Sequence, residues 1–167
     1  MPISKIAPCL WFNGEAEEAA KLYVSLFPGS KIDKVSRYQN ETRLPVSFPN
    51  GTALLVEFTL AGQRFQALNG GPQFHHSEAL SLSISCRDSK EVDHYWNGLT
   101  ANGGSEGPCG WVKDRFGVSW QVVPEGLGDL MTDPDPERRD RALQTMLKMK
   151  KLDLAAMRAA ADGRLTP

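Results

Sequence analysis

Two glutamines lie inside apolar strands, where the amide group of each must find a partner. Gln66 stands in the run FQALN, and Gln121 stands in SWQVVP, near the end of the stretch 109–124. A buried amide without a hydrogen bond is costly, so each glutamine either meets a polar neighbour or faces a cavity. Residues 118–123 alternate as a strand does, which predicts that Gln121 points to one face of a sheet.

Residues 79–86 alternate between apolar side chains and serines over the whole length of a strand. An antiparallel or mixed sheet often packs one face on the core and leaves the other face wet. We therefore expect helices on the apolar face and a hydrated surface or cavity on the serine face. The serines of this face are Ser81, Ser83 and Ser85.

The same alternation, applied to every expected strand, defines a candidate small-molecule site with apolar walls and a few polar groups. Its residues are Cys9, Trp11, Gln66, Leu68, Ser81, Ser83, Ser85, Gln121 and Val123, with Cys109 and Trp111 added from a short strand before the last hairpin. In the alternative interpretation, the serines bond to neighbouring strands and the glutamines to the backbone.

Other candidate residues fit a structural role better than a chemical one. Adjacent His75 and His76 would point apart, so the segment 75–78 favours a solvated loop over a metal site. Cys109 could be a nucleophile if its pKa were lowered, but a buried inert thiol fits better. Gly70-Gly71 is a weak phosphate signal, and no G-x-G-x-x-G motif opens a helix, so the usual nucleotide-fold motif for S-adenosylmethionine is missing.

The first half of the chain supplies one strand, one helix and three further strands. We expect strands at 6–12 and 31–38, a helix at 16–27, and a hairpin formed by 52–60 and 63–69. Pro8 cannot donate to a ladder, which predicts that the first strand lies at a sheet edge. The polar segment 39–51 is expected to be a long loop.

The second half repeats this order, and a helical extension follows it. A helix around 92–99 begins at Asp88, which with Glu91 resembles a capping box. Helices are expected at 137–149 and 154–161, after a linker punctuated by Pro134 and Pro136. The apolar stripe of the extension must be buried, on its own sheet edge or on a second subunit, which favours a homodimer. His94 and the lysines at 148, 150 and 151 are expected on solvated helix surfaces.

An internal repeat relates the two halves. The strand at 6–12 and its helix recur 74 residues later, and residues 61–68 align with 116–123 at a shift of 55. The second shift places Gln66 and Gln121 at one repeat position, which favours a shared role over two unrelated bonds. Each half therefore reads as a β-α-β-β-β module, because self-similarity of this kind marks a repeated unit.

Paired β-α-β-β-β modules resemble the vicinal oxygen chelate superfamily, the glyoxalase/bleomycin resistance/dioxygenase group. The segments PCLWFNGEAEEAAKLY, FQALNGGP, EALSLSISC, CGWVKD and GVSWQVVP look like its PhnB-like branch, often labelled 3-demethylubiquinone 3-methyltransferase-like. The resemblance implies an α+β fold with a curved mixed sheet, a domain over 1–125 with modules at about 3–70 and 78–125, and a helical extension over 126–167.

The resemblance also places the metal ligands of the superfamily at four positions of this chain. They fall at Ala7, Gln66, Ser81 and Gln121, where an alanine has no donor and neutral amides bind divalent ions weakly. We therefore expect no metal and no cofactor. The expected function is the binding of a small, partly apolar organic molecule; the alternative is an enzyme of the same superfamily acting on such a molecule, as a methyltransferase, lyase, isomerase or dioxygenase.

Composition limits the setting and the partners. The chain has 167 residues, 41% of them hydrophobic, and a formal net charge of −1, so no basic surface for nucleic acid is expected. No stretch approaches the ~20 apolar residues of a membrane span. Three widely spaced cysteines suggest no disulfide framework, and together with the absence of a secretory signal they favour a cytoplasmic protein.

Overall fold

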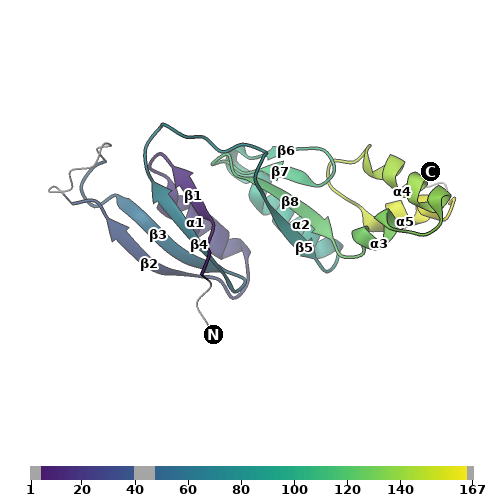
Figure 1. Ribbon diagram of the computed structural model, residues 1–167, viewed down its shortest axis with the longest axis horizontal. Helices are drawn as coiled ribbons and strands as arrows, with labels where there is room; N and C mark the ends of the chain where they lie inside the picture. The colour runs from purple at the N-terminus through teal and green to yellow at the C-terminus, as the bar shows by residue number, and fades with distance from the viewer. Residues whose placement is uncertain (1–4, 40–47, 165–167) are drawn as a thin grey trace. The chain divides into compact units, whose positions relative to one another are not determined.

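The computed structural model describes residues 5–39 and 48–164 of the chain. The chain divides into two compact units, Met1–His76 and Ser77–Pro167, which are described separately (Figure 1). Most of the long loop expected at 39–51 lies outside the described residues. None of the described helices is long and apolar enough to cross a membrane.

The first unit is a four-stranded sheet with one helix, as the sequence predicts. Strand β1 is parallel to β4, the other neighbours are antiparallel, and the strand order is β1-β4-β3-β2. Strand β1 is therefore an edge strand, as Pro8 predicts. The elements are β1 (Cys9–Phe12), α1 (Ala16–Leu26), β2 (Lys31–Arg37), β3 (Ala53–Leu60) and β4 (Gln63–Asn69).

One face of this sheet packs against α1, whose buried residues Ala16, Ala19 and Ala20 are small enough to let the helix approach closely. The buried amide of Asn69 then fixes the start of the helix. Its Oδ1 accepts from the N–H groups of Gly14 (2.8 Å) and Ala16 (3.1 Å), and its Nδ2 donates to the Ala53 carbonyl (2.8 Å). A distant strand residue thus satisfies the first N–H of the helix, which has no partner within the helix, and the N–H of Gly14 just before it.

The second unit begins with the repeated module. Its sheet has the order β5-β8-β7-β6, with β5 parallel to β8. The elements are β5 (Ser81–Cys86), α2 (Ser89–Thr100), a 3-10 turn η1 (Ala101–Gly103), β6 (Ser105–Glu106), β7 (Trp111–Lys113) and β8 (Ser119–Pro124). Helix α2 buries Val92, Tyr95, Trp96 and Leu99.

Strand register confirms the internal repeat residue by residue. Cys9 is the partner of Gln66 in the first sheet, and Ser83 is the partner of Gln121 in the second. These pairs are related by the same shifts of 74 and 55 that align the sequence. Ile6 and Leu80, expected on the apolar faces, are 80% and 66% exposed, because the edge strands begin only at Cys9 and Ser81.

Side chains fix both ends of this module. Asp88 accepts from the Glu91 N–H (2.9 Å), as a capping box requires, but the Glu91 carboxylate accepts from the Arg87 N–H (2.8 Å) in place of the Asp88 N–H. In the last hairpin, buried Asp114 accepts from two backbone N–H groups and from the Trp120 indole (2.9 Å). The turn at Lys113-Asp114-Arg115 therefore has a structural role.

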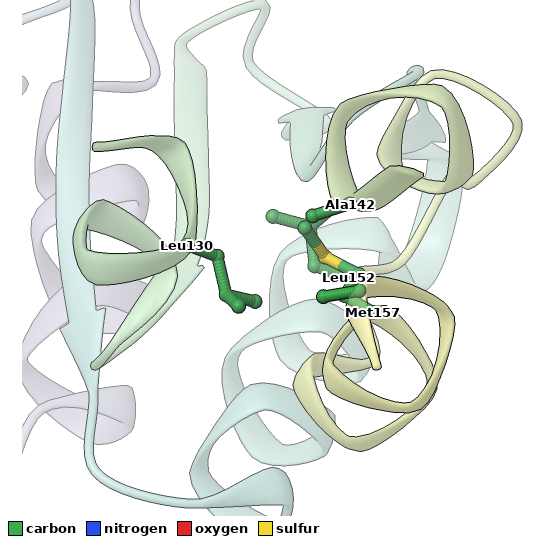
Figure 2. Packing of buried hydrophobic residues seen from close by; sticks show 5 residues of the cluster. Leu130, Ala142, Leu152 and Met157 are labelled. Atoms are coloured by element: carbon green, nitrogen blue, oxygen red, sulfur yellow. The ribbon is translucent and has the colours of Figure 1, made fainter. Parts of the chain in front are cut away.

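The extension is a cluster of three helices with its own small core. Leu130, Ala142, Leu152 and Met157 pack together, with Ala161, between the helices (Figure 2). The helices are α3 (Leu127–Met131), α4 (Pro136–Met146) and α5 (Leu154–Ala161). Helix α3 lies in the segment expected to be a linker, and Pro136 opens α4 behind the capping Asp135. Helix α4 ends at Met146, three residues before the expected end.

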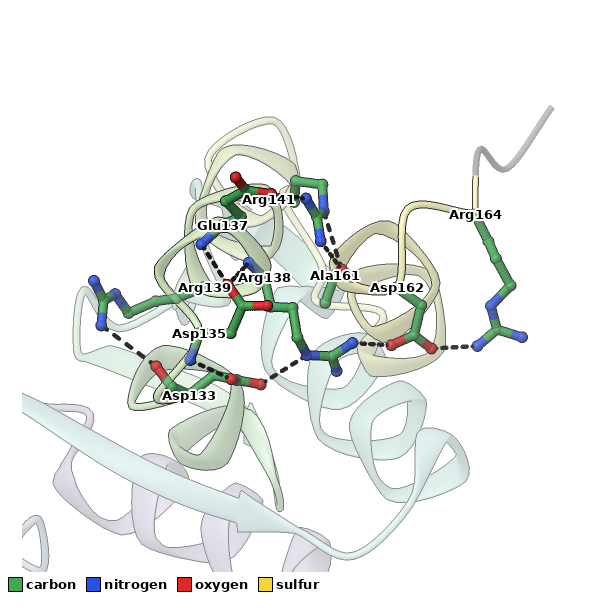
Figure 3. A network of polar contacts seen from close by, with 9 residues as sticks. All are labelled: Asp133, Asp135, Glu137, Arg138, Arg139, Arg141, Ala161, Asp162 and Arg164. Carbon is green, nitrogen blue, oxygen red and sulfur yellow. Dashed lines mark hydrogen bonds and ion pairs between the residues drawn. The ribbon is translucent and has the colours of Figure 1, made fainter.

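Charged side chains join the helices of the extension at its surface (Figure 3). The Arg138 guanidinium donates to Asp133 (3.0 Å) and also pairs with Asp162. Arg141 donates to the Ala161 carbonyl at the end of α5 (2.7 Å). These contacts cross-link the start of α4 to the end of α5, while the apolar core lies between them.

Candidate functional site

The serine face of the second sheet lies opposite α2, as the alternation predicts. Ser83 and Ser85 are exposed and Ser81 is half-buried. Gln121 donates from Nε2 to the Ser81 Oγ at 2.9 Å, and Trp111 is the cross-strand partner of Gln121. The structure thus brings three candidate residues, Ser81, Gln121 and Trp111, together on one face.

A surface cavity of about 370 Å³ adjoins this face, and we call it the Trp111 cavity. Its volume lies within the range of about 300–1,000 Å³ that small-molecule sites occupy. It is built from β6, β7, the loop between them, and the start of β8. The lining residues are Glu78, Ser105, Glu106, Gly107, Pro108, Trp111, Val112, Lys113 and Ser119.

Ser119 is a buried polar residue of this cavity that sequence reasoning did not include in the candidate site. It is only 2% exposed, and its Oγ has no hydrogen-bond partner among the described residues. Its strand parity, the same as that of Gln121 and Val123, is visible in the sequence. The structure adds that Ser119 is the register partner of Ser81 and Lys113. A buried hydroxyl without a partner is unusual in native structures and requires an explanation.

Charged side chains at the rim of the cavity are paired. Lys113 binds Glu78 and thereby lowers the pKa of that carboxyl. Glu106 accepts from the Trp96 indole (2.9 Å), and this bond, helped by Lys150, lowers the pKa of Glu106. Both carboxylates are therefore ionised at neutral pH, and each already has a cationic or N–H partner.

Cys109 adjoins the cavity wall, but its thiol contacts the extension. The Sγ lies 3.6 Å from the Met146 carbonyl, and the residue has a positive φ of 54°. The neighbouring residues Gly107 and Pro108 line the cavity. The structure thus places Cys109 in the loop that connects the cavity to the helices of the extension.

The first unit holds four further candidates on the sheet face opposite α1. Cys9 is paired in register with Gln66, and Trp11 with Leu68. The half-buried Trp11 donates from Nε1 to the Gly71 carbonyl (2.8 Å), and its ring lies so close to Gly70 that a Cβ there would be 2.3 Å from it. Gly70 and Gly71 therefore hold the Trp11 ring, the first by close packing and the second by accepting the indole hydrogen bond.

Two more residues extend this aromatic and polar surface of the first unit. Phe74 contacts the Trp11 ring edge to face, with centroids 4.9 Å apart. Glu57, the register partner of Gln66, accepts from Arg64 at 3.3 Å. The sequence analysis named neither residue. For Glu57 the reason is that an ion pair across two strands becomes visible only when the strand register is known.

The four positions to which the resemblance assigns metal ligands carry residues that do not fit a divalent ion. Ala7 has no donor atom, and the Gln121 amide is directed through its N–H at Ser81. The described residues contain no group of three or more His, Cys, Asp or Glu side chains arranged to hold a metal. We therefore derive no chemistry through a metal.

The remaining candidates have structural surroundings. The His76 ring packs edge to face on Phe12 (5.2 Å), and His94 is exposed beside Tyr95, as expected. Burial, with a smaller effect of Glu91, raises the pKa of the Cys86 thiol to about 11, so this cysteine is unreactive. The side chains of Lys150 and Lys151 are exposed but pair with Glu106 and Asp93.

Comparison with known proteins agrees with this architecture. The family model described as 3-demethylubiquinone-9 3-methyltransferase matches residues 4–123. The PhnB protein of Bacillus cereus is 32% identical, with a TM-score of 0.64 over 72% of this chain and 99% of that one. Protein PA1353 of Pseudomonas aeruginosa shares the fold, at 22% identity and a TM-score of 0.60 over 74% and 98% of the two chains. No curated protein matches the sequence.

The family match spans both β-α-β-β-β modules and ends within β8. The PhnB protein is covered almost completely, while about a quarter of this chain lies outside that match. The expected resemblance is confirmed: the chain belongs to the 3-demethylubiquinone-9 3-methyltransferase family, the PhnB-like branch of the vicinal oxygen chelate superfamily.

Proposed function

We propose that this protein binds a small, partly apolar organic molecule in the Trp111 cavity, without a metal. The observation that carries the proposal is the buried Ser119 hydroxyl, which lines the cavity and has no hydrogen-bond partner among the described residues. Leaving such a group unpaired costs about 1–3 kcal/mol, and a ligand that bonds to it recovers that cost. Structural serines normally avoid this cost, so the hydroxyl supports a binding role.

The shape and chemistry of the cavity favour a ring that carries an oxygen substituent. The Trp111 side chain offers an aromatic wall for offset or edge-on contact, and Gly107 and Pro108 add uncharged surface. Ser119 can donate to a carbonyl or accept from a phenol. The family description names a ubiquinone precursor, and a quinol ring has both of these features.

A calorimetric titration with the ubiquinone head group tests this proposal. We would use dimethoxy-methyl-hydroquinone, kept reduced so that it cannot alkylate the exposed Cys9. We expect one equivalent to bind, and Ser119→Ala to weaken binding by about tenfold, the effect of roughly one hydrogen bond. Ser25→Ala, which removes an exposed hydroxyl bonded to Leu22, is the matched control and should leave affinity unchanged. Equal affinity in wild type and Ser119→Ala would refute the assignment.

The alternative is an enzyme, which the family description favours by naming methyl transfer. S-adenosylmethionine carries an adenosine and an amino-acid part, and a 370 Å³ cavity with one indole wall fits a single ring better than a ring together with this cofactor. Incubation with S-adenosylmethionine and an excess of the 3-demethyl head group, which keeps a free hydroxyl where dimethoxy-methyl-hydroquinone already carries a methoxy group, separates the two functions. A binder saturates once, whereas a methyltransferase accumulates O-methylated product.

We also propose that the chain is a cytoplasmic homodimer. The three cysteines are free, which suits a reducing compartment. Ala142 and Met146 of the expected apolar stripe pack in the core of the extension, so the part of the stripe left for a subunit contact is Leu147, which is 56% exposed just after α4. Light scattering on the eluting protein should give twice the chain mass of 18.4 kDa, and a monomer at all concentrations would exclude the dimer.

A further inference from the structure

We infer that residues 149–152 of the extension are positioning residues of the Trp111 cavity, because they hold the loop that forms one of its walls. The loop is Gly107–Gly110, between β6 and β7. Its first two residues line the cavity, and its last two contact the extension. The consequence for ligand affinity rests on the proposed function; the consequence for the loop itself does not.

Backbone hydrogen bonds make the principal connection. The Cys109 N–H donates to the Met149 carbonyl (2.8 Å), and the Gly110 N–H donates to the Lys150 carbonyl (2.7 Å). The loop is bound to β7 on its other side, where the Gly107 N–H donates to the Trp111 carbonyl (2.8 Å) and the Trp111 N–H to the Pro108 carbonyl (3.0 Å). The loop is therefore held between the strand that carries Trp111 and the extension.

Side-chain packing adds to these bonds at Gly110. A Cβ at this position would lie 2.9 Å from Leu152 Cδ1 and 2.9 Å from the Val122 carbonyl oxygen, so only glycine allows the approach. The positive φ of 84° favours glycine as well. The dipeptide Cys109-Gly110 is thus the attachment point of the extension.

An ion pair reaches the cavity rim directly. Lys150 lies 3.5 Å from Glu106, a lining residue, and Lys151 pairs with Asp93 on α2. Each of these exposed pairs contributes little by itself. Together with the two backbone bonds, they connect the segment 149–152 to the module at four points.

Leu152 also belongs to the core of the extension, where it packs with Leu130, Ala142 and Met157 (Figure 2). One side chain therefore contacts both the loop and the core. Coupling between two sites is reciprocal. If the packed core of the extension stabilises the loop, a ligand that orders the loop must therefore stabilise this core by the same free energy. The family model ends at residue 123, so this support comes from outside the matched residues.

The test compares two core substitutions in the full chain. Leu152→Ala removes contacts with the core and with Gly110, whereas Met157→Ala removes a similarly buried side chain that belongs to the core alone. We would measure amide exchange of Cys109 and Gly110 by NMR, and hydroquinone affinity by calorimetry. We expect Leu152→Ala to speed exchange at both amides and to weaken binding at least about fivefold more than Met157→Ala does.

Protected amides in Leu152→Ala, or equal loss of affinity in both variants, would overturn the inference. If Leu152→Ala does not fold, Leu152→Val takes its place with the same readouts. If wild type binds no hydroquinone, the proposed ligand class fails, and the inference is then decided by amide exchange and by the Trp111 indole N–H signal, which should shift in Leu152→Ala and stay unchanged in Met157→Ala.

Discussion

Gln121 donates from Nε2 to the Ser81 Oγ at 2.9 Å, so two of the positions to which the superfamily resemblance assigns metal ligands are hydrogen-bonded to each other here. The two residues lie on the parallel strands β8 and β5, whose register pairs Ser83 with Gln121. The bond therefore runs diagonally across the two strands, from Gln121 to the residue two positions before its register partner Ser83. A neutral hydroxyl and an amide thus contact each other at two positions where a divalent ion would need carboxylate or imidazole donors.

Replacing Gln121 by alanine should cost little stability. The Ser81 bond is partly exposed, so we expect Gln121→Ala to lower the free energy of unfolding by about 1 kcal/mol. Because Gln121 is the partner of Trp111, its loss should also weaken hydroquinone binding. Urea unfolding and calorimetry measure the two effects. Collapse of the fold would instead mean that Gln121 is mainly a structural hydrogen bonder.

Divalent metals should neither bind tightly nor stabilise the protein. We expect incubation with zinc, nickel, manganese or ferrous iron to leave the thermal midpoint unchanged, because Ala7, Gln66, Ser81 and Gln121 offer no anionic donor. Mass spectrometry of untagged protein, before and after incubation, checks the stoichiometry. One retained metal per chain would place the ligands elsewhere, and His75, His76 and Glu78 would be the first residues to substitute.

The sequence was sufficient to predict the modules, because alternation and the repeat with shifts of 74 and 55 fix the strands and their faces. The contribution of Ser119 was harder to predict. Its parity is visible, but whether a strand serine is buried and left without a partner depends on the neighbouring strands. The attachment of the extension could not be predicted either, because it uses the backbone carbonyls of Met149 and Lys150. Every residue has such a carbonyl, so the residue types give no signal.

Ser119→Ala should make the ligand-free protein more stable while it weakens binding. The substitution removes a buried hydroxyl that has no partner among the described residues, and it changes the shape of the side chain only slightly. We expect a gain of about 1 kcal/mol, which corresponds to a rise of about 2–4 °C in the thermal midpoint for a chain of this size. Differential scanning calorimetry measures it. A lower midpoint would show that the hydroxyl already bonds to ordered water and has a structural role.

The ion pair between Glu17 and Arg37 should make stability depend on pH in the acid range. Arg37 donates to both Glu17 oxygens (2.7 and 3.2 Å) and, with Lys21, lowers the pKa of Glu17 from 4.5 to about 2. A carboxyl whose pKa is lower in the folded state adds stability that is fully present above the unfolded value near 4.5. This contribution is lost as the pH falls from there through about 2.

We therefore expect Glu17→Gln to destabilise the protein at pH 6 by about 0.5–1 kcal/mol, the range of a well-oriented surface pair. The difference from wild type should shrink steadily between pH 4.5 and pH 2, when measured by urea unfolding at each pH. Glu15→Gln is the matched control, because it removes the same charge two residues earlier, at the N-cap of α1. A difference between wild type and Glu17→Gln that stays constant down to pH 2 would show that the pair does not couple α1 to β2.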